Sequence, residues 1–162
     1  MLADRIVAAV RACVGTRFRA QGRVPGLGLD CVGVVLVAAA AAGVVAAVPA
    51  YALGGDHAGL LLAVLAAHGC VPVQLPSPGD ILVLAPDRRH RHLAVATPEG
   101  VVHAHAGLGR VVEGPIDSGW AIIGAWRLPR SGERLTGIAA QRLPRSGDRL
   151  TVTGAQRLPG AY

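Results

Sequence analysis

The sequence predicts an α+β domain in which helices come first and an antiparallel sheet follows. Apolar residues in the first 70 positions recur at helical spacing, whereas from about position 76 onward short β-rich runs alternate with turn residues. Strands joined by short turns pair antiparallel, so this order along the chain is typical of α+β folds. A chain of 162 residues is close to one typical domain, so a second independent fold is not expected.

Three helices are expected in the first half of the chain. The first ends before Gly15, a plausible stop. The second contains Val32–Val48, a run of 17 Val, Leu, Ala and Gly residues. Because a bilayer span needs roughly 20 residues, a buried central helix is expected here rather than a membrane span. The third is capped by Asp56 and stops at Gly69. The expected helices cover residues 2–14, 31–48 and about 57–68.

The second half of the chain is expected to form the sheet. Pro98-Glu99-Gly100 between two apolar runs favours a hairpin connection. Gly15–Asp30, rich in Gly and Arg, is too broken for a regular element and suits a loop that shapes a cleft. The expected strands are Ile81–Ala85, His92–Thr97, Val101–Ala106, Arg110–Glu113 and Ala121–Arg127.

A repeat sets the C-terminal residues apart. Arg127-Leu-Pro-Arg-Ser-Gly recurs at Arg142, and Arg157-Leu-Pro opens a third copy, so the period is 15 residues. Each copy has too few core-forming residues to bury a core alone. We therefore expect a domain over residues 1–129 and a flexible, arginine-rich tail over 130–162. The alternative for the tail is an arm that docks on an acidic partner.

Charge and cysteine usage exclude several classes of protein. Residues 1–126 hold nine Arg and eight acidic residues, net +1, whereas residues 127–162 hold seven Arg and two acidic residues, net +5. The basic balance thus belongs to the tail, which disfavours a whole-surface nucleic-acid binder. Three Cys cannot all pair, so no disulfide framework is expected. Charged residues interrupt the first apolar run, so no signal peptide is expected and the chain is expected to be made in the cytoplasm.

The junction between the glycine-rich loop and the long apolar helix is a candidate site. A thiol at Cys31 lies at a helix N-terminus, where free N–H groups and the positive end of the helix dipole favour the thiolate. The same N–H groups can hold an oxyanion that develops on an attacked carbonyl. Cys31 is therefore a candidate nucleophile. The alternative is a small buried residue without chemistry, which is the commoner fate of a cysteine.

Histidines of the expected sheet supply a candidate base. His92 opens one strand and His103 lies on the next, so the hairpin between them brings both rings to one end of the sheet. One imidazole can take the proton of Cys31 while the second orients the first through its other ring nitrogen. His57 and His68, at the two ends of the third helix, are expected on the surface.

Two rival sites were weighed for the same residues. His90-x-His92 and His103-x-His105 each place two imidazoles on one face of a strand, so a zinc site is geometrically possible. No cysteine pair or nearby carboxylate completes it, so neither a metal nor another cofactor is expected. All four Ser lie in turns or in the tail and no Gly-x-Ser-x-Gly elbow occurs, which excludes a serine hydrolase.

The order of these features resembles the NlpC-type cysteine peptidases of bacterial cell walls, and most of all their branch in phage tails and gene transfer agents. A glycine-rich loop precedes Asp-Cys at a helix start, and His residues then follow on two successive strands. The resemblance spans about residues 2–128. The matching stretches are Gly15–Phe18, Gly28–Gly33, Val48–Tyr51, Pro78–Leu82, His92–Val95, Val102–Ala104 and Val111–Glu113.

The resemblance implies a papain-like fold, with N-terminal helices packed on a central antiparallel sheet, that cuts amide bonds in the peptidoglycan stem peptide. Carried over, Cys31 is the nucleophile, His92 the general base and acid, and His103 the orienting third residue, while Phe18 and Asp30 belong to the substrate-binding loop. It also implies partners at a phage-like tail tip, where the particle delivers the enzyme to the cell-wall space to open the wall for DNA. No membrane span and no specific nucleic acid are implied.

One departure from the family pattern matters for activity. Family members usually carry Tyr where this chain has Phe18, so a hydroxyl that would help to hold substrate or oxyanion is absent. Two alternatives therefore stay open beside the peptidase. The domain is a catalytically weak structural component of the tail tip, or its Cys-His pair serves acyl transfer or the hydrolysis of another amide.

Overall fold

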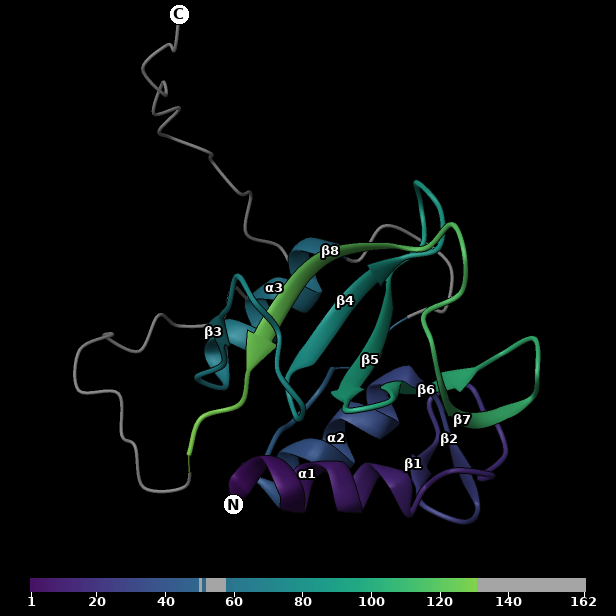
Figure 1. Cartoon of the computed structure of the whole chain (residues 1–162), viewed down its shortest axis with the longest axis horizontal. Coiled ribbons are helices and arrows are strands. Elements are labelled where there is room, and N and C mark those ends of the chain that lie inside the picture. The colour runs from purple at the N-terminus through teal and green to yellow at the C-terminus, as the bar shows by residue number, and fades with distance from the viewer. Residues whose placement is uncertain (50, 52–57, 131–162) are drawn as a thin grey trace, which may run out of the picture.

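The computed structural model describes residues 1–49, 51 and 58–130. Figure 1 shows the elements in chain order. The helices are α1 (Leu2–Arg11), α2 (Cys31–Ala41) and α3 (Ala58–Ala67). The strands are β1 (Arg23–Val24), β2 (Gly28–Leu29), β3 (Val71–Pro72), β4 (Ile81–Ala85), β5 (His92–Thr97), β6 (Gly100–His105), β7 (Arg110–Gly114) and β8 (Ala121–Arg127).

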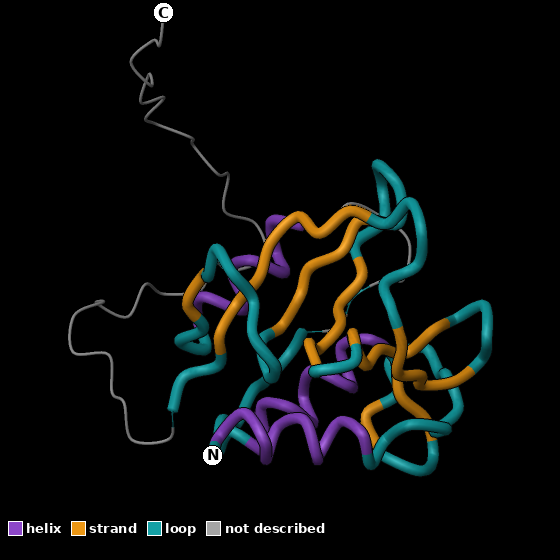
Figure 2. The backbone as a smooth tube through the Cα atoms, viewed as in Figure 1, coloured by secondary structure: helices purple, strands orange, loops and turns teal. Residues whose placement is uncertain are grey.

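An antiparallel sheet with the order β3-β8-β4-β5-β6-β7 forms the centre of the molecule. Helices α1 and α2 pack against each other, and α2 lies against β5 and β6 (Figure 1). The backbone trace in Figure 2 shows the helices α1 and α2 on one side of the strands. The small β1-β2 hairpin precedes α2 and contacts its start. The predicted α+β class is confirmed.

The sheet follows the register that the turn residues indicate. Thr97 pairs with Gly100 across the expected hairpin, and Ile81 pairs with Val95 on the neighbouring strand. All five predicted strands are present, with bounds that differ by at most one residue at each end. A two-residue connection fixes the pairing of β5 with β6, because a slip by one residue would turn every buried side chain outward.

The core lies between the helices and one face of the sheet. Because the chain is poor in aromatic residues, the core is built from aliphatic side chains that are close to fully buried. Small alanines on α2 let the helix approach the strands closely. The residues of this core include Ile6, Val10, Val34, Ala38, Ile81, Val83, Leu93, Val95 and Val102.

The second helix is shorter than the apolar run predicts. It ends at Ala41 instead of continuing to position 48. Gly43 adopts a left-handed φ of 77°, and the Val44 N–H donates to the Ala39 carbonyl at 2.9 Å, which closes the helix in a Schellman-type cap. Hydrophobicity alone does not reveal this stop, because the chain stays apolar on both sides of it.

Two further expectations need correction. The first helix ends at Arg11 rather than near Val14, and a turn carries the chain to Gly15, where φ is 89°. The segment before Asp30, expected to be irregular throughout, contains the β1-β2 hairpin. Two-residue strands are too short to leave a periodic signal in a sequence.

Several expectations fall on residues that the structure does not describe. These are the cap at Asp56, the position of His57 and the repeats over residues 131–162, so the boundary of the tail stays a prediction. Among the helices within the described ranges, none has the length and apolar character that a bilayer span requires.

Gly33 allows the start of α2 to pack directly on the preceding loop. A Cβ added at Gly33 would lie 2.3 Å from the Gly22 carbonyl oxygen and 2.9 Å from Leu29 Cδ2. Such an overlap forces the helix away from the loop.

We expect Gly33→Ala to lower the free energy of unfolding by about 1–3 kcal/mol, the usual cost of overpacking, although Ala is the better helix former. Chemical denaturation measures the change. Gly114→Ala is the matched control, since an added Cβ there meets nothing within 4 Å. Equal stability of Gly33→Ala and the wild type would contradict the close packing.

Candidate active site

Asp30 fixes the start of the helix that carries Cys31. Its backbone is extended, with φ of −108°, and its side chain is fully buried. One carboxylate oxygen, Oδ1, accepts a hydrogen bond of 2.9 Å from the Gly33 N–H, which makes Asp30 the N-cap of α2. The carboxylate thereby satisfies a first-turn N–H group that has no partner within the helix.

The Asp30 carboxylate also accepts hydrogen bonds from the preceding loop and from a tyrosine. Gln21 donates its backbone N–H to Oδ2 at 2.8 Å, and Arg23 Nη1 donates to Oδ1 at 2.7 Å. The Tyr51 hydroxyl also donates to Oδ2 in a very short hydrogen bond. With four donors, Asp30 acts here as a structural anchor, and the contact with substrate expected for it stays a prediction.

Cys31 is half-buried at the first position of α2. Burial, the largest effect, raises the pKa of its thiol to about 11, and the negative charge of Asp30 adds to the rise. Backbone hydrogen bonds of Leu93, Val32 and Cys31 itself act in the opposite direction. The helix start thus favours the thiolate as expected, but burial outweighs this effect, so the net result is a raised pKa of the thiol.

His92 and His103 are in direct contact, as the hairpin predicts. His92 Nε2 and His103 Nδ1 are 2.8 Å apart, and the rings meet edge to face at 4.9 Å between centroids. This hydrogen bond uses Nε2 of His92, so Nδ1 is the nitrogen left for a proton from another group. His103 is buried, which suits an orienting role rather than contact with solvent.

Two groups beside this histidine pair, Trp120 and Asp117, are not indicated by the sequence analysis. Trp120 packs edge-on against His92, at 5.0 Å between centroids, and against His103 at 5.8 Å. His105 follows at 5.4 Å from His103, and its Nε2 contacts Asp117 Oδ2 at 3.0 Å. One available signal was that Trp120 is one of only two tryptophans in an aromatic-poor chain.

Both rings are poor bases in the resting protein. Burial is the largest cause that lowers the pKa of His92, to about 3, and the neighbouring His103 and His105 lower it further. Burial also lowers the pKa of His103. The Asp117 carboxylate raises both pKa values and partly offsets these effects. Burial thus disfavours the thiolate of Cys31 and the charged forms of both imidazoles.

The structure brings Cys31 near the strand that carries His92 without joining the two side chains. The backbone of Leu93 lowers the pKa of the Cys31 thiol, and Leu93 directly follows His92. Within the described ranges, no hydrogen bond connects Cys31 Sγ with His92. Catalytic hydrogen bonds are often long in unliganded enzymes and tighten when substrate binds.

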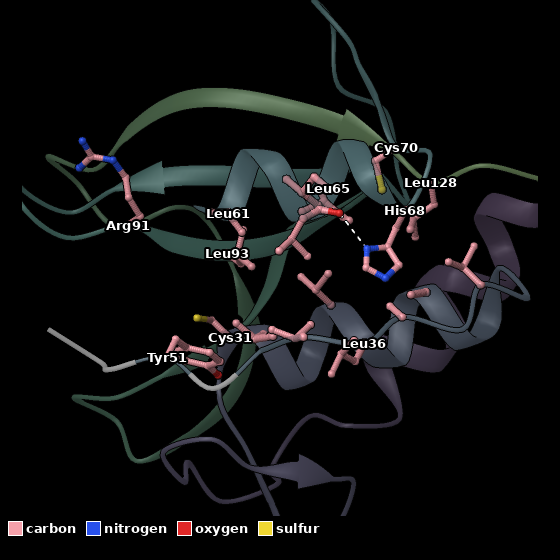
Figure 3. A pocket seen from close by; sticks show the side chains of 18 of the residues that line it. Cys31, Leu36, Tyr51, Leu61, Leu65, His68, Cys70, Arg91, Leu93 and Leu128 are labelled. Atoms are coloured by element: carbon pink, nitrogen blue, oxygen red, sulfur yellow. Dashed lines mark hydrogen bonds between the residues drawn. The ribbon is translucent and has the colours of Figure 1, made fainter. Parts of the chain in front are cut away.

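Cys31 lines a cleft of about 140 Å³ between α2 and α3. In Figure 3, Cys31 and Tyr51 lie together at one end of the cleft, and His68 and Cys70 lie toward the other. The walls are mainly aliphatic, with Leu36 on α2 among them. The sulfur therefore faces an apolar cleft, which explains the strong effect of burial on its pKa.

His68, which the sequence predicts on the surface, is half-buried and forms two hydrogen bonds. Its Nδ1 lies 2.8 Å from the Val64 carbonyl oxygen, and its Nε2 accepts a hydrogen bond of 3.2 Å from the Ala47 N–H (Figure 3). These contacts join the end of α3 to the segment after α2. The other expectation, for His57, concerns a residue outside the described ranges.

Phe18 lies in the loop before α2 and packs partly buried against the main core. Its backbone N–H donates to the Gly109 carbonyl at 2.8 Å, so the loop is tied to the β6-β7 turn. Its expected contact with substrate stays a prediction. Phe18 has no hydroxyl, but Tyr51 lines the cleft and brings a hydroxyl to the start of α2.

The histidine pairs weighed as zinc ligands take different partners. His90 Nδ1 contacts Asp87 Oδ2 at 2.7 Å on an exposed loop, away from the contact between His92 and His103. No group of three or more His, Cys, Asp or Glu side chains suited to a metal occurs in the described part of the chain.

No protein-family model matches this chain, and no curated protein matches it significantly.

Trp120 is expected to shield the His92–His103 pair from solvent. We expect Trp120→Ala to raise the pKa of His92 by at least about one unit toward its ordinary value, because it removes part of the burial that disfavours the imidazolium. NMR titration of the ring protons measures the change. Trp120→Phe, which keeps an aromatic cover, is the matched control. An unaltered His92 titration in Trp120→Ala would contradict this role.

The lowered pKa of His92 has a consequence for stability. Between about pH 6.5 and pH 3 the unfolded chain binds a proton at this position that the folded protein does not bind. The free energy of unfolding therefore falls as the pH falls through this range.

We expect His92→Gln to flatten that dependence, measured by denaturant unfolding between pH 3 and 8. Gln74→Ala, at an exposed position without a titratable group, serves as the control and should keep the wild-type slope. The same slope in His92→Gln and the wild type would show that the His92 pKa does not differ between the folded and unfolded states.

Proposed function

We propose that this protein is a cysteine peptidase that hydrolyses amide bonds of the peptidoglycan stem peptide. The observation that carries the proposal is the hydrogen bond between His92 Nε2 and His103 Nδ1, beside a cysteine that begins a helix packed on the same strand. A base oriented through one ring nitrogen, with a thiol at a helix N-terminus, is the arrangement that thiol acyl transfer requires.

The specific substrate and setting rest on the resemblance to NlpC-type peptidases. That likeness suggests a papain-like fold and a phage-like tail tip as the place of action, with delivery to the cell-wall space by the particle. The antiparallel sheet with helices packed on it is compatible with such a fold. The resemblance, rather than the geometry, therefore carries the choice of peptidoglycan among possible amides.

In the acylation step, Cys31 Sγ attacks the carbonyl carbon of the amide while its proton passes to His92 Nδ1. The negative charge that develops on the carbonyl oxygen is held by the Cys31 backbone N–H at the helix start. Collapse of this intermediate breaks the C–N bond, and His92 returns the proton to the leaving amine. The acyl group is then bound to the sulfur as a thioester.

Water completes the reaction. His92 takes a proton from the water molecule, the oxygen attacks the thioester carbonyl, and the thiol leaves with the returned proton. The products are a free acid and a free amine. His103 holds the His92 ring in the orientation that both steps need.

A catalytically weak structural component of the tail tip is the second candidate. The raised pKa of Cys31 and the lowered pKa of His92 favour it, since both keep the proton on sulfur in the resting protein. Acyl transfer is a third candidate function, and the reaction products distinguish it from hydrolysis. Mass spectrometry would find a new amide after transfer but a free acid and amine after hydrolysis.

We expect Cys31→Ala to reduce cleavage of purified muropeptides by about 10³-fold or more, the usual loss when a nucleophile is removed. Product analysis by liquid chromatography and mass spectrometry measures it. Cys13→Ala is the matched control, because Cys13 is buried in the core apart from the cleft. Undiminished cleavage by a folded Cys31→Ala protein rejects the assignment.

A further inference from the structure

A buried negative charge lies directly beside the candidate nucleophile. Asp30 precedes Cys31 in the chain and has no exposed surface. The cap needs a side-chain acceptor at this position, but a carboxylate also repels the thiolate that attack on a carbonyl requires. The charge of Asp30 therefore works against the reactivity of the adjacent thiol unless another group balances it.

Arg23 is placed to balance that charge. Its Nη1 donates to Asp30 Oδ1 at 2.7 Å and to the Gly22 carbonyl at 2.8 Å. Arg23 lies on β1, which pairs with β2 immediately before Asp30, so the hairpin fixes the position of the guanidinium. The side chain is only 29% exposed, which limits the screening of this ion pair by water.

Tyr51 completes the contact from the opposite side. Its hydroxyl accepts from Arg23 Nη2 and donates to Asp30 Oδ2, and the guanidinium lies 5.3 Å from the centroid of its ring. The Gln21 side-chain amide also donates to the Tyr51 carbonyl at 3.0 Å. The segment at Tyr51, which lines the cleft beside Cys31 in Figure 3, is thereby tied to the helix cap.

We propose that Arg23 is a positioning residue for the Cys31 nucleophile. Its guanidinium, seated by the Tyr51 hydroxyl, partly neutralises the buried Asp30 carboxylate, so that the cap opposes the thiolate less than an unpaired carboxylate would. This inference rests on the proposed function for the role of Cys31, but the charge relationship among the three side chains exists independently of any substrate.

Other charged or titratable groups lie around the same thiol. His90 and Arg91 line the cleft from the loop before β5, and His92 begins that strand. His90 contacts Asp87, and Arg91 Nη1 donates to the carbonyl of His90. His68 and Cys70 line the cleft on the side of α3. None of these side chains forms a hydrogen bond with Asp30 in the described ranges, whereas Arg23 does.

The test is a double-mutant cycle on Arg23 and Asp30, in which the reactivity of Cys31 is measured. The rate of alkylation by iodoacetamide is followed from pH 6 to pH 11 on the intact protein, and peptide mapping assigns the label to Cys31. Arg23→Gln should raise the pKa of the thiol and slow alkylation at pH 7.5 by about tenfold.

The partner variants distinguish this role from a purely structural one, because it predicts the direction in which each variant shifts the thiol pKa. Asp30→Asn keeps a capping side chain but removes the charge, so it should lower the thiol pKa. The double variant Arg23→Gln/Asp30→Asn should return toward the wild-type value. Arg23→Lys, which keeps the charge, should stay near the wild type, and the exposed Arg17→Gln is the matched control.

Opposite shifts in the two single variants and their cancellation in the double variant support the inference. Shifts in the same direction, or no shift in a folded Arg23→Gln protein, overturn it. Muropeptide cleavage by the wild type is measured in parallel. The predicted thiol titration without cleavage would reject only the peptidase, whereas cleavage without the predicted titration would reject only the role of Arg23.

Discussion

The carboxylate of Asp30 is the constraint on which the candidate site depends. It receives donors from the helix that follows, from the loop that precedes it and from Tyr51, which lies twenty residues beyond Cys31. A buried carboxylate with fewer partners would carry a large desolvation penalty. The position of Cys31 is therefore fixed by the need to satisfy its neighbour, and the cleft wall at Tyr51 is fixed by the same need.

Burial dominates the electrostatics of the site. Burial raises the pKa of the Cys31 thiol and lowers the pKa of His92. Both shifts favour the neutral groups, so the proton stays on the sulfur. In the proposed mechanism, attack on a carbonyl therefore requires proton transfer together with bond formation, and charge develops where helix N–H groups can receive it. Arg23 at the cap and Asp117 near the histidines supply the balancing charges.

The sheet and the histidine pair were predictable because their signals are local. Alternating apolar residues and a short turn determine the register of β5 with β6, and the register brings His92 and His103 to one end of the sheet. The end of α2 was not predictable from apolar content, since the left-handed Gly43 that stops it lies within a continuous apolar run. Trp120 and Asp117 reach the site through tertiary packing, which leaves no periodic pattern in the sequence.

The sequence alone determined the α+β class, the five strands β4 to β8 and the placement of Cys31 at a helix start, because backbone periodicity and turn chemistry act over a few residues. It also indicated the family that the chain resembles. Only the tertiary structure decided that Asp30 is buried among four donors, that Arg23 and Tyr51 meet over it, and that the thiol is held neutral. Those properties depend on desolvation and on contacts between distant segments, which exist only once the chain has folded.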